Sequence, residues 1–168
     1  MVILSIDFDG TIVKDEYPGI GKALPGAIQA INELYDDGYC IIINSCRARD
    51  KEDEMIDWLN RNGVKYCHCN ENCCERIVNY RTDCRKISAD CIIDDKSLMM
   101  LNLEQDNGWH NVKHMIRLKF GENHDDHIGC AYLIIEVVPV SACYRTDKRR
   151  PCRACPVVDC RRSRREQI

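Results

Sequence analysis

The stretch Ser5-Ile6-Asp7-Phe8-Asp9-Gly10-Thr11 follows the apolar run Val2-Ile3-Leu4, which predicts a first strand that ends at two aspartates. Residues i and i+2 of a strand point to the same side, so Asp7 and Asp9 would share one face. Two carboxylates that close repel each other unless a cation, a shared proton or water relieves the repulsion. The stretch alone therefore fits a Mg²⁺ site, and equally a solvated turn, because Asp and Gly both favour turns.

An alternation of helices and strands follows this opening. After a loop or flap at residues 11–24, Pro25 fits the first turn of a helix that Gly38 ends, and residues 39–44 are an apolar run typical of a fully buried strand. Further elements are predicted as a helix over 50–62, a strand over 64–67, a short helix within 68–85, a strand over 89–95, a helix over 97–105 and a fifth strand over 111–118. This rhythm predicts an α/β, Rossmann-like three-layer sandwich around a mostly parallel sheet, without a large cap domain.

Three predicted strands end in polar side chains. Asp7 and Asp9 follow the first strand, Asn44 and Ser45 follow the second, and Asp94 with Asp95 follows the strand over 89–95. In a doubly wound sheet the carboxyl ends of the strands meet at one crevice, where ligands bind. The pattern therefore predicts a functional site at this edge of the sheet.

Residues 1–118 resemble the haloacid-dehalogenase-like (HAD) superfamily. The resemblance rests on four motifs in order, namely Asp7-Phe8-Asp9-Gly10-Thr11, Ser45 after an apolar strand, Lys86, and Asp94-Asp95 after another apolar strand. It implies a Rossmann-like fold and a Mg²⁺-dependent phosphatase that works through an aspartyl-phosphate. The segments between the motifs are too short for a cap domain, which is similar to the small capless members with an open site.

The resemblance also implies roles for single residues. Asp7 would be the nucleophile and Asp9 the general acid and then base, while Ser45 and Lys86 would contact and neutralise the phosphoryl group. Candidate Mg²⁺ ligands are Asp7, the backbone carbonyl of Asp9, Asp94 and Asp95, and candidate substrate-binding residues are Thr11, Asn44, Ser45 and Arg47. Simpler interpretations exist for single residues, such as a turn for Ser45, a surface charge for Lys86 and a helix cap for the Asp94-Asp95 pair. The expected substrate is a small phosphorylated metabolite or a nucleotide.

Composition and charge suggest an acidic body with a basic end. The 168 residues are 45% apolar and 30% charged, as in ordinary soluble proteins, and the net charge is −3. Residues 145–168 hold nine Lys or Arg and three Asp or Glu. This basic tail makes binding of nucleic acid or a protein partner, or processing of nucleic-acid ends, the alternative function. No signal peptide or membrane-spanning run is apparent, so a cytoplasmic location is expected.

Thirteen cysteines are unusual in such a chain and point to thiols or metal ligands. In the predicted C-terminal extension, residues 119–168 with a possible strand over 131–140, a candidate Zn²⁺ set is Cys143, Cys152, Cys155 and Cys160, although a disordered tail is the preferred interpretation. A second group, either metal-binding or redox-sensitive, contains Cys67, His68, Cys69, Cys73 and Cys74. Cys40 and Cys91 are predicted as small core residues.

Overall fold

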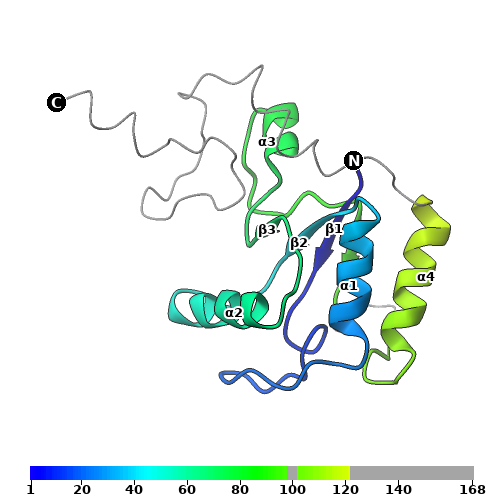
Figure 1. Cartoon of the computed structure of the whole chain (residues 1–168). Coiled ribbons are helices and arrows are strands. Elements are labelled where there is room, and N and C mark those ends of the chain that lie inside the picture. The colour runs from blue at the N-terminus through cyan, green and yellow to red at the C-terminus, as the bar shows by residue number, and fades with distance from the viewer. Residues whose placement is uncertain (98–101, 122–168) are drawn as a thin grey trace.

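The computed structural model describes residues 1–97 and 102–121 (Figure 1). The strands of this part are β1 (Ile3–Ile6), β2 (Cys40–Ile43), β3 (His68–Cys69) and β4 (Cys91–Ile93). Its helices are α1 (Ala27–Asp36), α2 (Asp50–Arg61), α3 (Cys74–Tyr80) and α4 (Gly108–Phe120). The α/β, Rossmann-like fold predicted from the sequence is confirmed.

The four strands form one parallel sheet in the order β3-β2-β1-β4. The register sets Ile3 beside Cys40 and Ile6 beside both Ile43 and Ile93. From β1 the chain first winds outward through β2 to β3, and then returns past β1 to add β4 on its other side. The point between β1 and β4 is therefore a topological switch point, where open α/β sheets bind their ligands.

Three helices cover one face of the sheet. The strand residues that point to this face are buried or partly buried, and together with the apolar stripes of α1, α2 and α4 they form the main core. Figure 1 shows α1 and α4 side by side, and their contact is extended by ion pairs from Lys113 and Arg117 of α4 to Glu33 and Asp37 at the end of α1. This layer anchors the loops that leave the carboxyl ends of the strands.

The opposite face carries a smaller cluster. Ile3, Cys40 and Ile42 point to this side and pack with Cys73, which directly precedes α3, and with Ile87 and Ala89 of the segment that leads into β4. Crossovers between parallel strands are nearly always right-handed, so the return path from β3 to β4 must pass over the face opposite α1. The chemistry of this face is thus set by the residues around β3 and α3.

Two predicted elements are wrong. Residues 111–118 are helical within α4, because Trp109, Val112 and Ile116 have helical spacing and point into the core. The third strand is His68–Cys69 and not 64–67, because the backbone N–H of Val64 donates to the carbonyl of Leu59 and that of Lys65 donates to the Asn32 side chain.

Other predictions fall partly or wholly outside the described residues. Residues 102–105 are not helical, and 98–101, the rest of the helix predicted over 97–105 apart from Ser97, lie outside. The strand over 131–140, the basic tail and the set of Cys143, Cys152, Cys155 and Cys160 also lie outside and stay predictions. Across 1–97 and 102–121, no helix is long and apolar enough to cross a membrane.

Candidate functional site

The ends of β1, β2 and β4 meet at one edge of the sheet, as predicted. The backbone N–H of Asp7 donates to the carbonyl of Ile93 at 2.9 Å, and that of Asn44 donates to the carbonyl of Ile6 at 2.8 Å. These two bonds continue the parallel pairing by one residue beyond each strand. They bring the segments that carry Asp7, Asn44 and Asp94 to the same place.

Three carboxylates gather at the switch point. One oxygen from each of Asp7, Asp94 and Asp95 lies within 4.8 Å of the others. Burial raises the pKa of Asp7 from 3.8 to about 6, and the charges of Asp94 and Asp95 act in the same direction, against the Phe8 N–H and Lys96. The raised pKa is due first to burial and then to the two neighbouring carboxylates, and both make a third negative charge unfavourable at this position.

The chemistry of these donors fits a hard divalent cation. Oδ1 of Asp95 is buried and has no hydrogen-bond partner within the described part of the chain. A cation bound between the three carboxylates would satisfy that oxygen and remove the repulsion, and carboxylate oxygens are the protein ligands that Mg²⁺ prefers. The carbonyl of Asp9 remains a predicted fourth contributor.

Thr11 and Gly10 hold the carboxylates in place. The Thr11 hydroxyl accepts the N–H of Asp95 at 3.0 Å and makes a long 3.5 Å contact to Oδ2 of Asp7, and the Thr11 carbonyl accepts from Trp109 Nε1 at 2.9 Å. Gly10 has φ +82°, and a Cβ there would lie 2.5 Å from Oδ2 of Asp95. Thr11 is fully buried, so the structure gives it a supporting place and not the predicted place against a substrate.

The second aspartate of the opening stretch has a partner that the sequence did not reveal. Both oxygens of Asp9 accept from Arg47, through Nε and Nη2 at 2.7 Å each. The Arg47 side chain is 1% exposed and that of Asp9 is 14% exposed. Such a two-pronged, largely buried pair is among the stronger polar contacts in proteins.

Arg47 also holds the flap. Its guanidinium donates to the carbonyls of Pro18 and Gly19, and it lies over the rings of Phe8 and Tyr17 at 5.5 and 5.3 Å from their centroids. The flap itself is a small hairpin closed by the backbone bonds from Lys14 to Lys22 and from Leu24 to Ile12. Arg47 therefore joins the first strand, the loop after β2 and the tip of the flap.

We expect Arg47→Met to lower the free energy of unfolding by about 1–3 kcal/mol, because it leaves the carboxylate of Asp9 without its partner in a poorly hydrated place. Urea unfolding measures the change. Asp9→Asn and the double variant complete a mutant cycle, in which the second substitution should cost much less once the first is present. Additive effects would mean that the two side chains do not stabilise each other.

Ser45 and Asn70 shape the loop after β2. The Ser45 N–H donates to Oδ1 of Asn70 at 2.7 Å, and Nδ2 of Asn70 donates to the carbonyl of Arg47 at 3.3 Å. The Ser45 hydroxyl accepts the N–H of Arg47 at 3.2 Å, which leaves its own proton to donate elsewhere. Asn44 is exposed beside Asp7.

The cation next to the carboxylates is Lys96, whereas Lys86 was predicted. Lys96 directly follows the Asp94-Asp95 pair, and its pKa is raised by Asp95 first and also by Asp7, Asp15 and Asp94. Lys86 lies on the exposed loop before β4, and its side chain has no ion pair with the described residues. Of the predicted site residues, the structure brings Asp7, Asp94 and Asp95 together, whereas the cation beside them is Lys96 and not Lys86.

Sequence reasoning missed three contributors to the site. The sequence could have indicated Lys96, because a cation that directly follows paired carboxylates is a candidate to neutralise charge at their site. Asn70 and Trp109 had no such signal, since they reach the site only through chain paths that bring β3 and α4 beside it.

A comparison with solved structures finds a conserved protein from Bacteroides thetaiotaomicron, with 30% sequence identity and a TM-score of 0.60. The alignment covers 73% of this chain and 96% of that one. No protein-family model matches the sequence, and no curated protein matches it either.

Proposed function

This chain belongs to the same family as the conserved Bacteroides thetaiotaomicron protein, and because that relationship indicates the fold alone, we propose the function from the site. The proposal is a Mg²⁺-dependent phosphatase of the HAD type that hydrolyses a phosphate monoester through an aspartyl-phosphate. The observation that carries it is the meeting of Asp7, Asp94 and Asp95 within 4.8 Å at the switch point of a parallel sheet. A small phosphorylated metabolite or a nucleotide is the proposed substrate class.

In this proposal Asp7 is the nucleophile. One of its oxygens attacks the phosphorus, the bond from phosphorus to the ester oxygen breaks, and Asp9 gives a proton to the leaving oxygen. Water then attacks the phosphorus of the aspartyl-phosphate, Asp9 takes a proton from that water, and the bond from phosphorus to Asp7 breaks. The products are an alcohol, inorganic phosphate and the original carboxylate.

The neighbouring residues have matching tasks. Asp7, Asp94 and Asp95 would hold Mg²⁺, which when bound supplies a positive charge that stabilises the phosphoryl oxygens. The ammonium of Lys96 and the hydroxyl proton of Ser45 are proposed to contact the same oxygens, where charge spreads in the transition state.

The Asp9–Arg47 pair sets a condition on this chemistry. Both oxygens of Asp9 are engaged, so proton transfer requires at least one of its bonds to Arg47 to open. A substrate phosphate is a good competing partner, because a guanidinium binds phosphate oxygens in the same two-pronged manner. Arg47 is thus proposed to move from Asp9 to the incoming phosphate, together with the flap residues that it holds.

The decisive experiment traps the intermediate on the protein. An aspartyl-phosphate is reduced by borohydride to homoserine, so treatment during turnover of an aryl phosphate should place homoserine at position 7, as read by mass spectrometry. Asp9→Asn should slow turnover by about 10²–10⁴-fold and increase the trapped fraction. Hydrolysis without homoserine at position 7, or with homoserine at another aspartate, would overturn the assignment of the nucleophile.

A further inference from the structure

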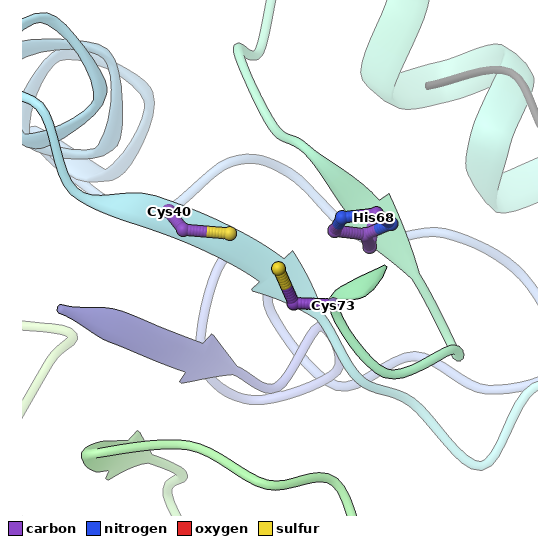
Figure 2. A group of neighbouring side chains, drawn as sticks. All are labelled: Cys40, His68 and Cys73. Carbon is purple, nitrogen blue, oxygen red and sulfur yellow. The ribbon is translucent and has the colours of Figure 1, made fainter. Parts of the chain in front are cut away.

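The sheet face opposite α1, α2 and α4 holds a group of sulfur and nitrogen donors. Cys40 and Cys73 are fully buried and His68 is 3% exposed, and one donor atom from each lies within 4.8 Å of the others. Figure 2 shows the sulfurs of Cys40 and Cys73 pointing toward each other beside β2, with His68 on the adjacent β3. Cys40 was predicted from the sequence as an ordinary core residue.

A third thiol belongs to the same group. Cys67 directly precedes β3, forms a hydrogen bond with the Cys40 thiol, and packs against the buried cluster that contains Cys40 and Cys73. Cys73 also lies near enough for its charge to act on Cys67. The donors that lie within 4.8 Å of one another are thus two thiols and one imidazole, from β2, β3 and the residue before α3, and Cys67 lies beside them as a fourth donor.

The spacing matches a tetrahedral metal site. A Zn²⁺ ion holds thiolates at about 2.3 Å, which places the donor atoms of a regular tetrahedron about 3.8 Å apart. The donors of Cys40, His68 and Cys73 are within 4.8 Å of one another, so their separations exceed that distance by at most about 1 Å.

A carboxylate lies beside the imidazole of His68. Nδ1 of His68 lies 3.5 Å from Oε1 of Glu71, while Nε2 is buried. Histidines that bind metals usually direct the other ring nitrogen to a carboxylate, which fixes the ring and increases its basicity. The proposal therefore assigns metal binding to Nε2.

We propose that Cys40, Cys67, His68 and Cys73 bind a structural Zn²⁺ ion. Four protein ligands close the coordination sphere, which is typical of structural and not catalytic zinc. Sulfur and imidazole donors favour Zn²⁺, whereas the all-oxygen cluster of Asp7, Asp94 and Asp95 favours Mg²⁺, so the two sites select different metals. The zinc site does not depend on the proposed phosphatase activity.

The position of the site explains what the ion would do. It would join β2 to the turn between β3 and α3, a turn in which Asn70 has φ +51° and supports the loop of Ser45. The strand β3 has only two residues and lies at the edge of the sheet. A metal ion would add a cross-link that fixes this short edge strand to β2.

The first test is the metal content of the full-length protein purified under reducing conditions. We expect one zinc per chain, lost from the variant with Cys40→Ser and Cys73→Ser. The zinc should remain in Cys84→Ser, an exposed thiol, and in the variant with Cys152→Ser and Cys155→Ser, which removes the other candidate set. Absence of zinc from the parent protein, or its retention after loss of Cys40 and Cys73, would overturn the proposal.

A second test does not depend on changing a buried residue. Co²⁺ added to the metal-free parent protein should give the absorption of a tetrahedral thiolate complex, and Glu71→Gln should weaken the binding by about 10–100-fold. Glu75→Gln, four residues further along the chain in the first turn of α3, is the matched control and should bind as the parent does. Equal affinities of the two variants, an octahedral spectrum, or a Cys40–Cys73 disulfide in place of the metal would each count against zinc.

Discussion

Asp7→Asn is expected to lower Mg²⁺-dependent release of phosphate from an aryl phosphate by at least about 10³-fold, as loss of a nucleophile does in other enzymes. The amide cannot attack phosphorus to form an acyl phosphate, and it is a weaker ligand for a cation. Initial rates at saturating substrate and Mg²⁺ measure the change. Asp57→Asn, on the exposed side of α2, makes the same chemical change away from the site and should keep the parent rate.

The same substitution should stabilise the protein when a chelator removes free metal. The pKa of Asp7 is about 6 in the folded protein and near 3.8 in the unfolded chain, so the folded state binds more protons between these values. The contribution of Asp7 to the free energy of unfolding therefore falls as pH rises from about 4 to 6 and is level above that range. With partial exposure taken into account, Asp7→Asn should gain about 1–2 kcal/mol at pH 7.

Addition of Mg²⁺ should reverse this order. Binding to the folded state alone stabilises the parent in proportion to the logarithm of the metal concentration, and the asparagine variant should respond much less. Thermal unfolding with and without Mg²⁺ makes the comparison. Full activity in Asp7→Asn would exclude the nucleophile, whereas equal Mg²⁺ stabilisation of both proteins would exclude Asp7 as a ligand.

Trp109→Ala is expected to have the largest effect on stability, about 3–5 kcal/mol, because a fully buried indole leaves a cavity that the core cannot fill. The ring lies in the main core, and its Nε1–H donates to the carbonyl of Thr11. The loss therefore reaches Thr11, whose hydroxyl contacts Asp7 and accepts the N–H of Asp95. Urea unfolding followed by circular dichroism measures it without relying on tryptophan fluorescence.

Two further variants separate packing from hydrogen bonding. Trp109→Phe keeps most of the apolar volume and leaves the Thr11 carbonyl without its donor, which should cost about 1–3 kcal/mol. Trp58→Ala removes the other tryptophan, which is only partly buried and packs edge-on against Phe8, and should cost less than Trp109→Ala. If Trp109→Ala costs no more than Trp58→Ala, α4 does not anchor the site.

Local patterns predicted much of the fold, and one of them was read wrongly. The stripes of α1 and α2 and the apolar run of β2 repeat within a few residues, so the sequence alone shows them. In α4 the window 111–118 alternates loosely and predicts a strand, although Trp109, Val112 and Ile116 have helical spacing once the window begins two residues earlier. A window that includes Trp109 therefore shows the helical period of α4.

The sequence by itself determined which chemical groups end each strand, because the alternation of helices and strands forces parallel strand ends to one edge. Only the tertiary structure decided which side chains lie next to each other. It paired Arg47 with Asp9 and buried Thr11. It also placed Lys96 beside the carboxylates and brought Cys40 close to His68 and Cys73. These partners are distant in the chain, and their meeting depends on strand register and loop paths that local periodicity does not encode.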